Sequence, residues 1–277
     1  MKNSTSKVVF VNLLITIFLT GCAAEHTLRN DRSDVAAAMF KERCKMAGEF
    51  IHRTVENVDG VYLLKVRPEN INYSEQYLLD DPYGRDHGGD AYIRSFLRGA
   101  YNTGVTPPKV LPRDFPPHIA YEFADVIDPS DGKRYRYTGR IEEPALTKKG
   151  YLPGYKIFVH TKTLVNSPAP RYGVTYDDIS TKKDRDFWIA GSSLKVIDLE
   201  KNEIIAERIG YFFDSAQGST AGGRSPWLWA TSNACPSFGA SPAFGNQSHQ
   251  TAIFVEKALQ PGLPKKLLKI TNFNKLS

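Results

Sequence analysis

The sequence predicts an α+β fold, in which a meandering antiparallel sheet packs against an N-terminal and a C-terminal helix. Strand-like segments joined by short turns dominate from residue 118 onward. An apolar pattern with helical spacing precedes them, and a second helical segment follows them. We therefore expect residues 33–277 to form a single globular domain.

The first helix is expected to begin at Ser33, which can cap it, and to end before Gly48. Ala36, Phe40 and Cys44 recur at helical spacing between these limits. This spacing places Cys44 on the side of the helix that faces the core.

A hairpin is expected next, because Asp59 and Gly60 separate the apolar runs 50–55 and 61–66. Residues 67–117 are irregular, and we expect packed loop with a short helix at 91–97. Later strands are expected at 119–127, 134–141, 155–164, 171–176, 187–199 and 204–213.

The last helix is expected at 250–259, capped by Ser248 and ended by Pro261. The lysine-rich tail 265–275 follows it. A solvated terminus is the favoured interpretation of this tail, and contact with an anionic surface is the alternative.

The first 21 residues have the composition of a secretory signal. Lys2 and Lys7 precede an apolar run at 8–19, which is shorter than the ~20 residues that span a bilayer. Small residues then lead to Cys22. A cleaved signal is favoured over a permanent membrane helix.

The junction Leu19-Thr20-Gly21-Cys22 resembles the lipobox of bacterial lipoproteins. The resemblance covers residues 1–22 only. It implies cleavage before Cys22, a diacylglyceryl group on its thiol and acylation of its amino group, so that palmitate-type chains hold the protein in a membrane. The alternative is a core cysteine that happens to follow an apolar run.

Residues 22–32 are expected to be a lipidated tether between the membrane and the body. Ala23 stands where an aspartate would favour inner-membrane retention in lipoproteins of enteric-type bacteria. The resemblance therefore implies an outer-membrane lipoprotein that faces the periplasm.

Charge argues against a nucleic-acid partner. The whole chain has a formal net charge of +6, and removal of the signal, with its two lysines and no acidic residue, leaves +4. No segment is dense enough in Lys and Arg for specific nucleic-acid binding. No cofactor motif or metal-ligand spacing is present, so we expect neither a cofactor nor a metal.

With Cys22 lipidated, Cys44 and Cys235 remain. Two cysteines in an oxidising compartment predict a disulfide. The alternatives are a catalytic thiol and a metal pair, but neither cysteine lies in a CxxC or Cys/His cluster.

The segment 215–249 contains one fixed charge, Arg224, together with Trp227, Trp229 and other aromatic residues. An aromatic loop of this kind can stack on sugar rings or contact a partner protein. These residues are therefore the candidate binding residues. The alternative, which we favour, is that the rings complete the core and that Cys235 holds the loop against the first helix.

Two other patterns could carry chemistry. The acidic residues at 80–90, with His87, could bind calcium or perform acid–base catalysis, but their spacing fits no EF-hand and a solvated turn is favoured. Ser192 and Lys195 match the SxxK pattern of penicillin-recognising enzymes. We reject this match, because the segment is a predicted strand and the partner motifs are missing, and no GxSxG elbow is present. No catalytic residue is therefore assigned.

These observations favour an envelope-anchored, non-catalytic module that binds or assembles with a partner protein or a glycan. A periplasmic hydrolase acting on cell-wall or lipid material is the alternative.

Overall fold

The computed structural model describes residues 31–69, 88–98, 120–147, 149–151, 153, 157–230, 232–237 and 250–262. The predicted signal with Cys22, the acidic residues at 80–87, Ser248 and the tail 265–275 lie outside them.

One large mixed sheet forms the centre of the protein, and few helices accompany it. The strand order is β1-β9-β8-β7-β3-β4-β5-β6, and β10 also pairs with β9. The strands are β1 (Gly48–Ile51), β3 (Gly60–Leu63), β4 (Phe123–Ile127), β5 (Arg134–Glu142), β6 (Ile157–Leu164), β7 (Tyr172–Asp178), β8 (Ile189–Asp198), β9 (Glu203–Phe213) and β10 (Ala234–Cys235).

The sheet is not purely antiparallel, which corrects the sequence prediction. Strand β3 runs parallel to both of its neighbours, β4 and β7. The other pairs in this sheet are antiparallel. A separate parallel pair joins β2 (Val55–Val58) to β11 (Leu259–Pro261).

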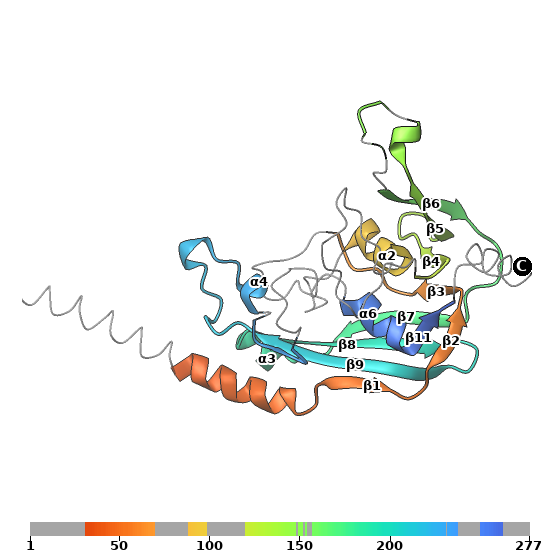
Figure 1. The fold of residues 1–277 in the computed structure, drawn as a ribbon. Coiled ribbons are helices and arrows are strands. Elements are labelled where there is room, and N and C mark those ends of the chain that lie inside the picture. The colour runs from red at the N-terminus through yellow and green to blue at the C-terminus, as the bar shows by residue number, and fades with distance from the viewer. Residues whose placement is uncertain are drawn as a thin grey trace, which may run out of the picture.

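Two helices cover one face of the sheet, here called the inner face. Figure 1 shows α2 (Gly89–Arg98) beside β4 and β5, and α6 (Gln250–Ala258) beside β8 and β9. Their buried side chains, which include Phe96 and Phe254, join one hydrophobic core with Val61, Leu63 and Val196 of the strands.

The helix at residues 31–44 packs on the opposite, outer face. Ala36 is fully buried in a cluster with Ile189, Tyr211 and Phe213. Successive residues of a strand point to opposite faces, so these positions on β8 and β9 face away from α6. Ser33 lies inside this helix rather than at its cap, and residues 31 and 32, expected in the tether, are helical.

Smaller elements complete the described chain. Figure 1 shows α4 at the end of the sheet opposite to β2 and β11. The elements are α3 (Lys182–Asp186), α4 (Pro226–Ala230), and the 3₁₀ turns η1 (Pro144–Leu146) and η2 (Ala221–Gly223).

The predicted hairpins have different outcomes. The hairpins β4–β5 and β8–β9 are confirmed: the strands of each pair antiparallel, with one register shift in β8–β9 between Val196 and Ile197. The hairpin around Asp59 and Gly60 is wrong, because β2 pairs with β11 while β3 enters the large sheet. Gly60 is a strand residue over which the Phe123 ring lies, and a Cβ there would come within 2.4 Å of that ring.

Candidate functional site

Trp227 lies in the core at one end of the sheet. Its side chain is 3% exposed and packs with Ala190, Phe212 and Ala230. The ring centroid lies 5.0 Å from that of Trp188 and 5.8 Å from that of Phe212. The indole of Trp227 therefore stabilises the end of the sheet and is covered by protein.

Arg224 holds the loop that precedes α4. Its Nη1 donates to Asp214 Oδ2 at 2.8 Å, and the fully buried Asp214 also accepts from the backbone N–H of Gly218 at 2.8 Å. Buried carboxylates need such partners. The predicted candidates Arg224 and Trp227 thus belong to one structural unit, while Trp229 lies on α4.

Sequence reasoning missed Trp188. Its φ is +55°, an unusual conformation for a bulky residue, and its indole packs between Trp227 and the backbone of Gly218. A Cβ at Gly218 would lie 2.3 Å from that indole. Gly218 could have indicated close packing at this position, but the indole that it contacts belongs to a residue 30 positions away in the sequence.

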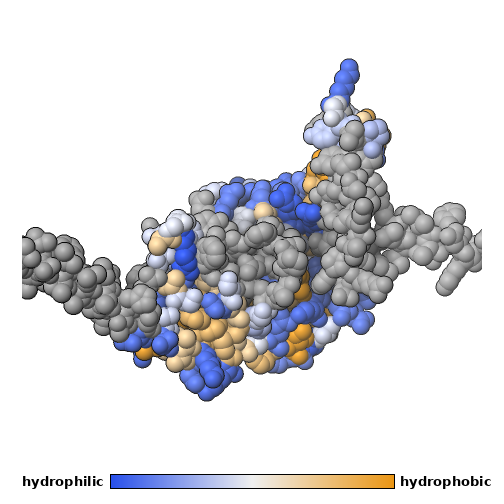
Figure 2. All heavy atoms as spheres, turned by 60° about the vertical axis from the view of Figure 1, so that its left-hand side comes forward, coloured by the Kyte–Doolittle hydropathy of each residue, from blue (hydrophilic) through white to orange (hydrophobic). Residues whose placement is uncertain are grey.

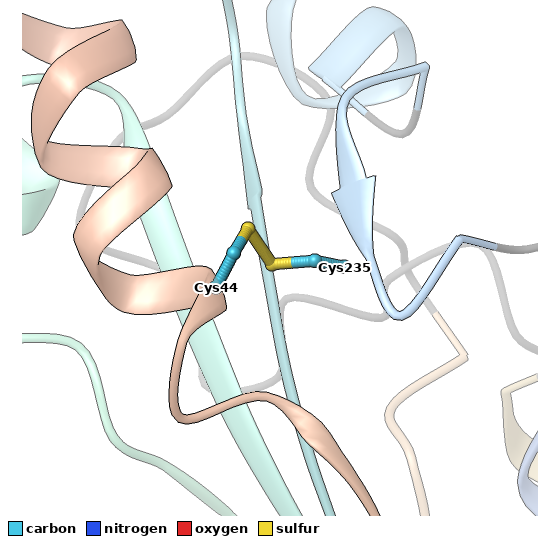
Figure 3. The surroundings of a disulfide bond; sticks show 2 residues. All are labelled: Cys44 and Cys235. Carbon is cyan, nitrogen blue, oxygen red and sulfur yellow. A yellow bond between two sulfur atoms is a disulfide. The ribbon is translucent and has the colours of Figure 1, made fainter.

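The predicted disulfide is present. Cys44 at the end of the first helix is bonded to Cys235 of β10, with a Cα–Cα distance of 5.6 Å (Figure 3). Both the alternative of a reactive thiol and that of a metal pair are thereby excluded for these two residues.

Arginines neutralise the fully buried aspartates. Arg136 Nε lies 2.7 Å from Asp125 Oδ1, and Arg43 Nε lies 3.0 Å from Asp184 Oδ1. A third such pair joins Arg171 to Asp198, where hydrogen bonds from Arg171 hold the pKa of the carboxyl well below its usual range.

The first two pairs connect neighbouring elements, β5 to β4 and the first helix to α3, and the lowered pKa of Asp198 keeps that carboxyl ionised. A buried carboxylate that is to act as a general acid needs the opposite, a raised pKa.

A His–carboxylate pair lies at the β6 edge of the sheet. His160 Nε2 of β6 is 3.6 Å from Asp90 Oδ2 in the first turn of α2, and the imidazole packs 5.8 Å from the Tyr137 ring. Asp90 belongs to the acidic cluster noted in the sequence, and the structure gives it a partner that sequence spacing could not indicate. The side chain of His160 is partly exposed.

Lys162 lies two residues after His160 on the same strand, β6. Its ammonium lies 4.2 Å from the centroid of the Tyr135 ring and pairs with Asp128. Hydrogen bonds from Lys162 and Ser130 hold the pKa of Asp128 well below its usual range. On β5 and β6 these side chains form a row of one lysine, one histidine and two tyrosines. The carboxylates beside the row, those of Asp90 and Asp128, are paired with its histidine and its lysine.

The SxxK match does not assemble a catalytic pair. Ser193 Oγ donates to Glu207 Oε1 at 2.6 Å on the outer face, and Lys195 Nζ lies 3.0 Å from Asp177 Oδ2. Ser192 is buried on the inner face, because adjacent strand residues face opposite sides. All three residues lie on β8, whereas the penicillin-recognising enzymes need the serine at the start of a helix.

Within the described ranges, no group of three His, Cys, Asp or Glu side chains could hold a metal ion. No helix in the same part of the chain is long and apolar enough to cross a membrane.

Comparison with known proteins gives no further assignment: no protein-family model, no curated protein and no solved structure matches this chain.

Proposed function

We propose that this protein is an envelope lipoprotein, anchored in the outer membrane through Cys22, whose body is a non-catalytic module that binds or assembles with a partner protein or a glycan. The lipobox-like sequence at residues 19–22 supports the anchor. This sequence favours a location on the periplasmic side of the outer membrane.

The disulfide is the observation that carries this proposal. Disulfides between structural elements persist in the envelope and are rare in the cytosol of mesophiles. Cys44 and Cys235 are 191 residues apart and join a helix to a strand, as expected of a structural link in an exported protein. An exported body that begins just after a lipobox has Cys22 as its point of attachment.

Binding is favoured over catalysis by how the ionisable groups are used. The fully buried aspartates pair with arginines, and Ser193 and Lys195 pair with carboxylates. These interactions hold strands and loops together. A body of this kind serves as a rigid support for surface contacts.

Lipidation is tested by mass spectrometry of the protein extracted from membranes of a producing bacterium. The expected N-terminal peptide begins at Cys22 and carries acyl chains, and a Cys22→Ala variant leaves the signal uncleaved. An unmodified Cys22 in a processed protein would contradict the anchor.

The binding role is tested by crosslinking in the native envelope and by sedimentation with isolated peptidoglycan sacculi. Specific capture of one protein, or co-sedimentation with sacculi, is the expected result. Trp229→Ala tests the candidate segment: it should weaken this capture if the segment makes the contact, and the melting temperature of the variant is measured as the control for folding. Absence of capture in both assays would contradict the proposal.

The hydrolase alternative rests on the Asp90–His160 pair, because a carboxylate can orient an imidazole for acid–base catalysis. We expect the purified protein to release no muropeptides from sacculi and no fatty acids from phospholipid vesicles. Release that is lost in His160→Gln would establish the alternative and overturn the non-catalytic role.

A further inference from the structure

The hairpin that joins β5 to β6 extends away from the body. Figure 1 shows it standing clear of the sheet, with η1 near its tip, and Figure 2 shows a projection from the body. Gly150, in the same connection, has a φ of +97°, and a Cβ placed there would have no heavy atom within 4 Å. The space beside Gly150 is therefore open.

Apolar side chains are presented at this tip. Leu146 is 79% exposed, the highest value among the exposed large hydrophobic residues of the described chain, and Tyr151 is 45% exposed. Lys149, also exposed, lies between them in the sequence. Below the tip, Arg140 Nε donates to Glu142 Oε1 at 2.7 Å, so a charged pair separates the apolar end from the body.

This combination has the chemistry of a membrane-interface contact. Leucine enters the boundary between headgroups and acyl chains, tyrosine prefers the same level, and lysine is attracted to anionic headgroups. We propose that the tip of the β5–β6 hairpin, through Leu146, Lys149 and Tyr151, inserts shallowly into an anionic lipid surface and orients the body on the membrane.

The size of the tip favours lipid over a protein partner. A specific protein interface buries at least about 1,000 Å² in total, which a leucine and a tyrosine on one turn cannot supply. A lipid contact can be weak and still be populated, because an acylated Cys22 would hold the body at a high effective concentration near the membrane. The inference thus rests on the proposed lipid anchor.

The experiment uses the full lipidated protein in vesicles of phosphatidylethanolamine and phosphatidylglycerol. With Cys22 acylated and Cys44 bonded to Cys235, a Thr147→Cys variant has one free thiol, which takes an environment-sensitive fluorophore beside the tip. We expect a blue-shifted emission and quenching by nitroxide-labelled lipids. The same label at Lys201→Cys, in the β8–β9 turn, should remain in water.

Leu146→Asp in the Thr147→Cys background should abolish both the shift and the quenching. The matched control is Leu164→Asp on β6, where an equally apolar but 48% exposed side chain outside the tip is removed, and it should retain both signals. Both positions are exposed, and circular dichroism verifies that each variant is folded.

The outcomes separate the inference from the anchor. An unquenched label at residue 147 in a protein whose Cys22 is acylated, as measured by mass spectrometry, overturns the membrane contact and leaves the anchor intact. Equal quenching at residues 147 and 201, or a signal unchanged by Leu146→Asp, also overturns it. An unacylated Cys22 contradicts the proposed anchor; the quenching is then measured on a Thr147→Cys variant that also carries Cys22→Ser, in which residue 147 again holds the one free thiol and its label reports whether the tip alone enters lipid.

Discussion

Cys44 and Cys235 link two segments that occupy the same edge of strand β9. Strand β1, which begins four residues after Cys44, pairs with β9 from Ala206 to Ile209. Strand β10, which ends at Cys235, pairs with β9 at Tyr211 and Phe212. The disulfide therefore joins the end of the first helix, just before β1, to β10, and so connects the two segments that supply strands to this edge (Figure 3).

Replacing both cysteines, as Cys44→Ala with Cys235→Ala, should lower the free energy of unfolding by about 2–4 kcal/mol, because the unfolded chain loses a long-range constraint. Urea denaturation followed by circular dichroism measures the change. Reductant should shift the wild-type midpoint toward that of the variant and leave the variant unaffected. Equal midpoints for the two proteins would show that the link carries no stability.

The fold could be predicted where short-range pattern decides it. The β4–β5 and β8–β9 hairpins depend on turns between adjacent apolar runs, and both form. The parallel neighbours of β3 depend on packing between segments more than 50 residues apart, which periodicity does not encode. Asp59-Gly60 misled for this reason: Gly60 accommodates the ring of Phe123 and is not a turn residue.

The candidate site was predictable only in part. With Cys22 assigned to lipidation, the disulfide had a single possible pairing, and it forms. The roles of Trp227 and Arg224 depend on their partners Trp188 and Asp214, which no local pattern identifies. The Asp90–His160 pair likewise joins α2 to β6 across 70 residues of sequence.

Asp214→Ala should destabilise the protein by about 3–5 kcal/mol, because it leaves the Arg224 guanidinium without its buried carboxylate. The matched control is Asp177→Ala, which removes an exposed aspartate paired with Lys195 at 3.0 Å. That change should cost less than about 1 kcal/mol. Urea denaturation compares the two variants. Similar losses in the free energy of unfolding would show that the Asp214–Arg224 pair stabilises the protein no more than an exposed pair does.

Gly218→Ala should lower stability more than Gly222→Ala does. Both glycines have positive φ, +80° and +68°, so each alanine costs about 1–2 kcal/mol in backbone strain. At Gly222 the added methyl meets no atom within 4 Å, whereas at Gly218 it overlaps the indole of Trp188. Overpacking adds about 1–3 kcal/mol there. Thermal unfolding measures the difference, and tryptophan emission should change only for Gly218→Ala; identical effects would contradict the close packing.

Tyr121→Phe tests a buried link between the segment just before β4 and the first residue of β11. The Tyr121 hydroxyl donates to the Leu259 carbonyl at 2.5 Å, and the side chain is fully buried in the core. Removing the hydroxyl keeps the ring and leaves the carbonyl without this donor, which should cost about 1–3 kcal/mol near neutral pH. Urea denaturation at pH 7 measures this loss.

The same substitution should change the response to alkaline pH. Burial raises the pKa of Tyr121 well above its unfolded value of about 10, so folding favours the neutral hydroxyl. This contribution to stability is complete below pH 10 and is lost as the pH rises from there toward the folded pKa. Burial also raises the pKa values of Tyr137 and Tyr211, so these two residues should still cause part of the loss of stability at alkaline pH in the variant. Urea midpoints measured from pH 8 to 11 should therefore fall less steeply for Tyr121→Phe than for the wild type, and parallel curves would show that Tyr121 ionises as readily in the folded protein as in the unfolded chain.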